Sequence, residues 1–223
     1  MGCTSLRSIT LSEGVKTIED SAFYGCTSLK NIVIPGSVTV IESKPFSDCT
    51  SLESIVVADG NPVYDSREGC NAIVETKTNA LVCGCKSSII PESVTEIKSE
   101  AFFHCTTLKS FTIPDSVTEI GDGAFSACTS LESITIPESV IYVGNFIGCT
   151  SLESIAIPKS ATSIGSFSKC TSLKSIKIPE GVTHIGLFDD CTSLESVTIP
   201  EGVTKLYHWT FSCCTSLKSI TIP

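Results

Sequence analysis

The chain has 223 residues, of which 41% are hydrophobic and 17% charged, so it can bury a core and is too apolar to be disordered. Its formal net charge is -9 and it has no long basic run, which argues against nucleic acid or an anionic membrane as the partner, because both are bound by clustered Lys and Arg. No apolar stretch approaches the roughly 18 residues of a membrane span, and residues 1–10 lack the apolar core of a secretory signal.

One short motif recurs from the first residues to the last. "GCTSL" at residues 2–6 returns at 25–29, and C-T-S-L or C-T-T-L recurs as far as Leu217. Successive motif cysteines are 21 or 23 residues apart, except for one separation of 56 residues. This period predicts stacked units, because one unit cannot bury its own apolar side chains whereas stacked units bury them against each other. The motif cysteines are Cys3, Cys26, Cys49, Cys105, Cys128, Cys149, Cys170, Cys191 and Cys214.

Each unit predicts a short strand and then a turn. Apolar residues alternate with Ser or Thr after the motif leucine, as Ile134 and Ile136 do in "SITIP", which is typical of a strand with one buried face. In most copies a Pro ends the strand, and "SVTEIG" or a similar segment follows, which we expect to form a short extended or 3₁₀-like turn. A Phe stands three residues before every motif cysteine but the first. We therefore expect the coils of a solenoid, with Leu, Ile, Val, Phe and Cys inside.

The recurring cysteine has a structural explanation. A buried position that repeats once per coil suits a small apolar side chain with a weak donor, which describes Cys. A zinc site needs converging ligands and a disulfide framework needs paired spacings, and one cysteine per coil supplies neither. We expect these cysteines to be free thiols.

The separation of 56 residues contains an insertion at residues 58–90. Two apolar runs, "NAIVE" and "ALVCG", flank the polar "TKTN", which predicts a β-hairpin. If Lys77 and Thr78 form its tip, Cys70 lies opposite Cys85 and Ala72 lies opposite Cys83. A disulfide between Cys70 and Cys85 is then possible, and two free thiols are the alternative.

The insertion offers two weaker candidates for a metal site. The "CGC" segment at 83–85 could bind a metal together with Cys70, but no histidine lies nearby in the sequence to complete the set. Oxygen ligands for calcium could come from Asp59, Asn61, Asp65 and Glu68, but their spacing is not that of an EF-hand loop. Turn and loop chemistry explains these residues more simply, and we expect no metal.

The later coils vary at one loop. "GDGAF" at 121–125 shortens to three residues in the coils with a 21-residue spacing, as in "GNF" at 144–146. The last full coil instead fills this loop with aromatic residues around Trp209. An exposed Trp209 would be a candidate binding hot spot, whereas packing on the neighbouring coil is the alternative that we favour.

The residue after each motif leucine is charged in all nine units, and we call this set the charged row. With strands about 4.8 Å apart, neighbours of opposite sign can form ion pairs, each contributing roughly 0.2–1 kcal/mol when exposed. The simpler interpretation is that these side chains are solvated and only help to set the register in which neighbouring strands pair. Recognition is the alternative, and the row with the outward Ser and Thr beside it is our candidate binding face. The charged row is Arg7, Lys30, Glu53, Lys109, Glu132, Glu153, Lys174, Glu195 and Lys218.

The combination of L-x-x-I-x-I-P, S-V-T-x-I-G, A-F and C-T-S-L resembles the BspA-type leucine-rich repeat of bacterial and protist surface proteins. The resemblance covers nearly the whole chain. It implies a curved, mostly β leucine-rich-repeat solenoid with parallel strands and coils of 21–23 residues, an extracellular or cell-surface setting, and adhesion or protein binding. Family members usually carry a secretion signal and are often longer, whereas the repeats here start at Cys3 and stop at Pro223. We therefore expect one solenoid over residues 1–223 that is a fragment of a longer protein.

Catalysis finds no support in the sequence. No nucleophile elbow, zinc-protease, P-loop or dinucleotide-binding motif is present, and His104, His184 and His208 fall at different positions of the repeat. We expect no cofactor, and a partner that is a protein or glycan on a host or neighbouring cell surface. A carbohydrate-binding surface module and an accessory repeat segment of a larger enzyme remain the alternatives.

Overall fold

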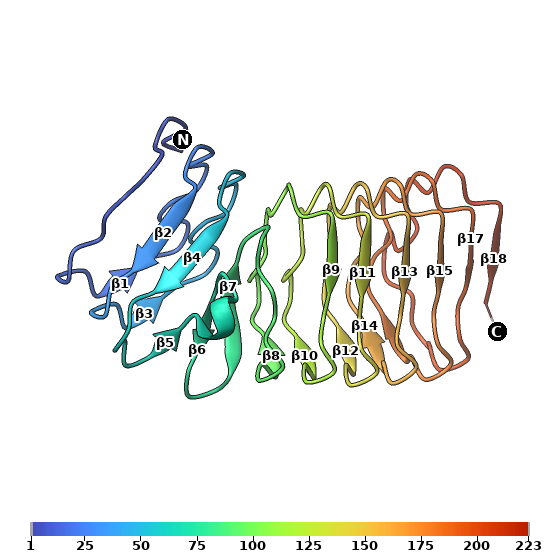
Figure 1. Ribbon diagram of the computed structural model, residues 1–223. Coiled ribbons are helices and arrows are strands. Elements are labelled where there is room, and N and C mark those ends of the chain that lie inside the picture. The colour runs from blue at the N-terminus through green and yellow to red at the C-terminus, as the bar shows by residue number, and fades with distance from the viewer. Residues whose placement is uncertain (1, 223) are drawn as a thin grey trace.

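Parallel strands stack in two columns along the molecule, as the computed structural model of the protein shows for residues 2–222 (Figure 1). Strands of the first column follow the C-T-S-L motif, and each pairs with the equivalent residues of a neighbouring coil, as Ser154 does with Ser175. The first column contains β2 (Asn31–Ile34), β4 (Ser54–Val57), β9 (Ser110–Thr112), β11 (Ser133–Thr135), β13 (Ser154–Ala156), β15 (Ser175–Lys177), β17 (Ser196–Thr198) and β18 (Ser219–Thr221).

The second column is built from the segment that resembles "SVTEIG". Each coil contributes only two strand residues here, so the segment is extended, as one of our two expectations had it. The described residues contain no α-helix, and hence no helix long and apolar enough to cross a membrane. The second column contains β1 (Thr17–Ile18), β3 (Val40–Ile41), β8 (Glu96–Ile97), β10 (Glu119–Ile120), β12 (Tyr142–Val143), β14 (Ser163–Ile164) and β16 (His184–Ile185).

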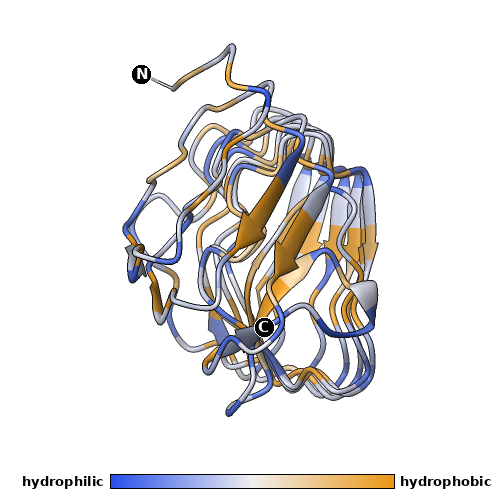
Figure 2. Ribbon diagram, turned by 60° about the vertical axis from the view of Figure 1, so that its left-hand side comes forward, coloured by the Kyte–Doolittle hydropathy of each residue, from blue (hydrophilic) through white to orange (hydrophobic). Residues whose placement is uncertain are grey.

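Alternating burial defines the two faces of the first column. Ile134 in β11 is buried, while Ser133 and Thr135 on either side of it are exposed. The same exposed, buried, exposed pattern holds in β9, β13, β15 and β17. Figure 2 shows the hydrophobic stretches recurring at corresponding places in successive coils. The fold class expected from the sequence, a mostly β leucine-rich-repeat solenoid, is confirmed.

Stacked phenylalanine rings run through the interior. Phe146 is fully buried, and its ring centroid lies 5.8 Å from that of Phe125 and 5.5 Å from that of Phe167, with nearly parallel planes. Offset stacking of aromatic rings at this spacing stabilises a core beyond the area that it buries. The phenylalanine before each motif cysteine is therefore a contact between coils.

The motif cysteine also makes a contact between coils. The thiol of Cys149 donates to the main-chain carbonyl of Phe125 in the preceding coil, with Sγ 3.1 Å from the oxygen. Cys49, Cys128, Cys170, Cys191 and Cys214 donate in the same way to the Phe carbonyl one coil earlier. A buried main-chain carbonyl needs a hydrogen-bond donor, and the small, weakly polar thiol of Cys supplies one, which explains why Cys stands at this position.

The neighbours of the cysteine explain the rest of the motif. Thr171 Oγ1 donates to the carbonyl of Thr150 at 3.4 Å, and other motif threonines repeat this bond from coil to coil. The residue before each motif cysteine from Cys26 onward has a positive φ, whatever its identity, as at Lys169 with 63°. The invariant letters of the motif are thus those whose side chains touch the next coil.

Residues 58–90 insert a hairpin that is part of the stack. It consists of β5 (Tyr64–Asp65), a short 3₁₀ helix (Arg67–Gly69), β6 (Ala72–Glu75) and β7 (Ala80–Gly84). Strand β7 pairs in parallel with β8, so it takes the place of a second-column strand. Strands β1–β4, which precede the insertion, are tilted relative to the strands from β9 onward, which follow it (Figure 1).

The hairpin is buried on both faces, which the sequence analysis did not predict. Ala72, Val74 and Leu81 belong to the core of the C-terminal coils, whereas Ile73 and Cys83 belong to the core of the N-terminal coils. All five are at most 4% exposed. The hairpin therefore forms a wall between two hydrophobic cores.

Gly84 in this wall receives the first ring of the C-terminal Phe stack. A Cβ atom at Gly84 would lie 2.5 Å from Cζ of Phe102, so no other residue fits without displacing the ring. The thiol of Cys105 faces the Gly84 carbonyl at 3.9 Å, where other coils offer a Phe carbonyl. Strand β7 thus makes the contacts with Phe102 and Cys105 that the preceding coil makes elsewhere in the stack.

The register of the hairpin differs from our prediction at the end away from the turn. Near the tip the predicted register holds, but a bulge between Ile73 and Val74 shifts the remainder by one residue. Ala72 therefore lies opposite Gly84, and Ile73 lies opposite Cys83. The pairing of Ala72 with Cys83, and with it the placing of Cys70 opposite Cys85, was wrong because a bulge leaves no clear sequence signal.

Candidate binding face

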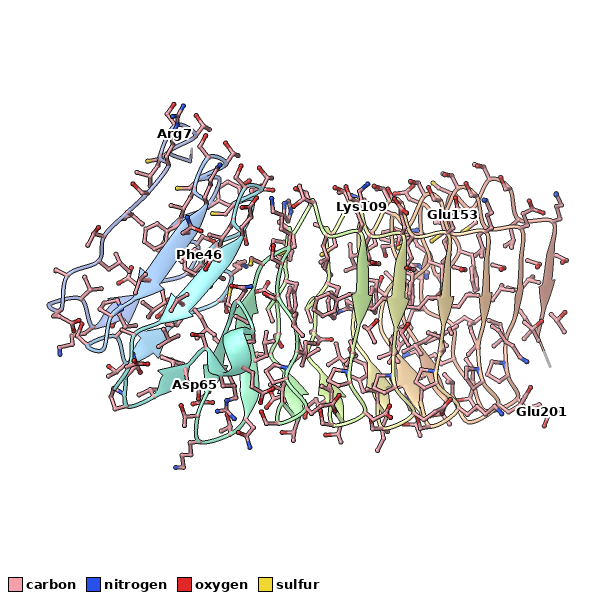
Figure 3. All side chains as sticks on the ribbon, in the orientation of Figure 1. Arg7, Phe46, Asp65, Lys109, Glu153 and Glu201 are labelled. Atoms are coloured by element: carbon pink, nitrogen blue, oxygen red, sulfur yellow. The ribbon has the colours of Figure 1, made fainter. Side chains whose placement is uncertain are left out.

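The charged row lies along one edge of the first column, and all nine of its side chains are exposed. Each follows a motif leucine, and the buried leucine fixes the direction in which its neighbour points into solvent. Figure 3 shows Arg7, Lys109 and Glu153 along the same border of the molecule. We call the charged row, together with the outward residues of the first-column strands, the strand face.

Some members of the charged row form ion pairs with the next coil. Lys174 Nζ lies 2.8 Å from a Glu153 carboxylate oxygen, and Lys218 Nζ lies 2.9 Å from one of Glu195. Side chains of both pairs are more than half exposed, so each pair contributes at most about 1 kcal/mol. Glu53 pairs instead with Lys86 of the insertion, at 3.1 Å. Ion pairs between neighbouring coils thus support the strand register in part of the charged row, but each contributes little.

Apolar residues interrupt the polar surface of the strand face. Val33 and Val56 are register partners in β2 and β4, and they are 54% and 42% exposed. We expected Ser and Thr at such outward positions and did not predict this patch. Its signal was present in the sequence, because "NIVI" and "SIVV" place an aliphatic residue between two inward ones.

A hollow of about 450 Å³ opens next to β13 and β15. Ala156 and Lys177 line it at outward positions where β11 and β17 carry Thr. Ile157, Pro179 and Gly181 contribute apolar surface, while Lys159 and Glu180 add charges. This combination of a small apolar hollow with a few charged groups suits the anchoring of a partner's side chain.

The aromatic turn of the last coil is exposed. Trp209 is 73% exposed and has a φ of 63°, so it does not pack on the neighbouring coil as we had favoured. It takes the position of Gly123, where the turn requires left-handed backbone. Tyr207 is 48% exposed, and Lys205 Nζ lies 4.7 Å from its ring centroid. Exposure of Trp209 follows from a turn whose backbone points the side chain outward.

The remaining candidate residues do not converge on a site. Cys70 and Cys85 are buried free thiols that contact main-chain carbonyls of Ala72 and Asn71, at 3.5 Å each. Burial raises the pKa of both thiols. A buried thiol with a raised pKa is a poor nucleophile.

Polar residues at the start of the insertion support turns. The side-chain oxygen of Asn61 accepts from the main-chain N–H groups of Val63 and Tyr64, and Asp65 accepts from Arg67. Within residues 2–222 no cluster of three or more His, Cys, Asp or Glu has the geometry to hold a metal ion.

A family model described as "BspA type Leucine rich repeat region (6 copies)" matches residues 1–67, 80–187 and 141–223. No curated protein matches the chain.

Several solved structures are similar to this fold. A leucine-rich cell surface protein from Faecalibacterium prausnitzii is 34% identical, with a TM-score of 0.71 over 98% of this chain and 54% of its own. A leucine-rich repeat protein from Bacteroides ovatus is 30% identical, with a TM-score of 0.64 over 93% of this chain and 53% of its own. The leucine-rich repeat protein of T. pallidum is 30% identical, with a TM-score of 0.58 over 66% of this chain and 77% of its own. The chain thus spans about half the length of the first two proteins.

Proposed function

Since the chain belongs to the BspA-type leucine-rich-repeat family, we propose that it is a non-catalytic protein-binding or adhesion module of a secreted or cell-surface protein. The observation that carries the proposal is the exposure of all nine side chains of the charged row beside a row of motif leucines, seven of which are buried. The cell-surface setting is supported by the description of the F. prausnitzii protein.

The stack restricts where recognition residues can stand. Inward Leu, Ile, Phe and Cys side chains contact the next coil, so changes there disturb packing. Of the two outward positions in each first-column strand, the first is Ser in all but β2, and the second varies among Thr, Val, Ala and Lys. A partner protein that lies across several coils would gather many modest contacts, as solenoid proteins commonly do on their extended faces.

The weakness of the ion pairs supports recognition. Because exposed pairs such as Lys174 with Glu153 stabilise the fold little, their charges are available to a partner at low cost. The hollow beside Ala156 and Lys177 lies on the same two coils as this pair, three or more residues farther along the chain, and offers an apolar anchor point. Charges would then guide the encounter and set the register of the complex, while the hollow adds affinity.

Carbohydrate binding is the second candidate, and Trp209 is the observation that favours it. Its indole is 73% exposed at a turn, beside the half-exposed ring of Tyr207. Exposed aromatic rings offer flat apolar surface with a polar edge, which suits a sugar ring as well as a protein side chain.

A binding screen against host surface proteins and glycans tests the proposal. On any hit, the triple variant K109E/K174E/K218E should weaken binding by about tenfold or more and change its salt dependence. The matched variant K16E/K77E/K169E changes three exposed lysines outside the charged row and should bind normally. Unchanged affinity of the first variant would move the site off the strand face, and a turnover reaction that depends on His184 or His208 would overturn the non-catalytic assignment.

A further inference from the structure

A second hollow, which we call the junction groove, opens in the second column where the insertion interrupts the stack. Its volume is about 620 Å³. Strand β3 and Glu42 form one side, Tyr64 and Val82 of the insertion line the middle, and residues of β8 and β10 form the other side. The groove is a direct result of the hairpin, because β5 turns back to pair with β6 and does not continue the column beyond β3.

One strand edge in the junction groove is not paired with another strand. Strand β8 has neighbours on both sides, whereas β3 pairs only with β1 among the strands of residues 2–222. On the groove side the main-chain N–H of Ile41 donates to Tyr64 Oη at 3.2 Å, so a side chain meets it there and not another strand. Val40 in the same strand is 44% exposed. The Tyr64 hydroxyl and not a strand covers this edge, so an extended segment of another chain can bind along it by replacing the hydroxyl as the acceptor of the Ile41 N–H.

Carboxylates surround this edge. Five carboxylate side chains line the junction groove, and the one lysine in its lining, Lys98, already pairs with Glu96 at 3.0 Å. The carboxylates are those of Asp20, Glu42, Glu75, Glu96 and Glu119.

Two of these carboxylates stand side by side on neighbouring strands. Glu96 and Glu119 are register partners on adjacent parallel strands, and like charges in that relation repel each other. The coils farther from the groove carry Tyr142, Ser163 and His184 at the same position of the repeat. The acidic residues of this column therefore gather where a strand edge is open, and their repulsion would be relieved by a cationic partner.

We propose that the junction groove binds an extended, lysine- or arginine-bearing segment of a partner protein alongside β3. The segment's main chain would lie along the open edge, and its cationic side chains would reach the carboxylates on both sides. The groove belongs to the second column and the strand face to the first, so this proposal and the proposed function can fail independently.

Fluorescence anisotropy with a fluorescein-labelled (Lys-Val)₅ peptide tests the proposal. Alternation places all lysines on one side of an extended segment. The native chain should bind this peptide and not the matched (Glu-Val)₅ peptide. The variant E42Q/E75Q/E119Q should weaken binding about tenfold, because three charge-assisted contacts are lost while the size and shape of the side chains are kept. The matched variant E13Q/E92Q/E201Q removes the same net charge from exposed glutamates outside both the groove and the strand face, and it should bind normally.

Three outcomes would overturn the proposal. These are absence of binding to the native chain, equal weakening by the two triple variants, and equal binding of the acidic peptide. Hydrogen exchange gives a second criterion that does not depend on the variants. The amide of Ile41 should exchange more slowly when the (Lys-Val)₅ peptide is bound, and unchanged exchange there would exclude an alignment with β3.

Discussion

Replacing Gly84 with Ala tests whether the inserted hairpin acts as a coil of the stack. The new Cβ would lie 2.5 Å from Cζ of Phe102, which is about 1.0–1.5 Å closer than the 3.5–4.0 Å at which carbon atoms pack best. Phe102 cannot move away easily, because it is fully buried, stacks on Phe125 at 5.2 Å and meets the edge of Phe111 at 4.8 Å. Overpacking of this kind costs about 1–3 kcal/mol, and the size of the clash places Gly84→Ala near the upper end.

Urea denaturation followed by far-UV circular dichroism measures this loss in the free energy of unfolding. The control is Gly14→Ala, where the added Cβ meets only Ser12 Oγ at 3.8 Å, so its effect should be small. In a Phe102→Leu background the penalty of Gly84→Ala should fall to below about 1 kcal/mol, because the ring that it strikes is gone. Native stability of Gly84→Ala, or an undiminished penalty in the Phe102→Leu background, would refute the packing of β7 against Phe102.

The other predictions concern the interior of the regular coils. Phe146→Ala should cost about 3–5 kcal/mol because it empties a buried ring position between two stacked rings, whereas Glu132→Ala should cost under about 1 kcal/mol; similar costs in urea titration would contradict a stacked core. An aqueous thiol reagent should label the exposed Cys3 and Cys213 in the native protein and reach Cys149 only after unfolding, and rapid native labelling of Cys149 would contradict its burial. Burial raises the pKa of Cys149 to about 12, while an unfolded thiol titrates near 8.5, so thiol burial favours folding fully below about pH 8.5 and progressively less as the pH rises toward 12. Urea midpoints in reductant should therefore fall between pH 8 and pH 10, and a constant midpoint would argue against the shift.

Periodicity predicted the coils well because the same contact recurs at every copy. A Phe, a Cys and a Leu at fixed spacings have one common solution, which is to meet their equivalents in the next coil. The structure also explains why the residue is Cys, because its thiol donates a hydrogen bond to a Phe carbonyl of the preceding coil. This contact could not be inferred from the sequence pattern.

The insertion was harder to predict because it occurs once. Alternating runs predicted a hairpin, but its register depends on a bulge at Ile73 and Val74 that leaves no compositional mark. Burial of both faces was visible in principle, since Ala72, Ile73 and Val74 form an uninterrupted apolar run, which is typical of strands covered on two sides. The junction groove could not be foreseen, because it depends on where β5 leaves the second column.

Exposure of single side chains was predicted only where backbone direction was fixed. Every member of the charged row was placed correctly in solvent, because the buried leucine before it sets the alternation. Trp209 was misjudged, since its direction depends on a positive φ at a turn and not on a strand. Alignment of Trp209 with Gly123 is the sequence signal that would have indicated this turn.

Footprinting of lysines with a partner bound tests the strand face most directly as the binding surface. The chain carries lysines on and off this face, so acetylation in the presence and absence of a partner from the screen, read by mass spectrometry, compares both regions in one experiment. We expect the partner to protect Lys109, Lys174 and Lys177 and to leave Lys16 and Lys77 as reactive as in the free protein. Unchanged labelling of the three strand-face lysines, with protection elsewhere, would contradict this expectation.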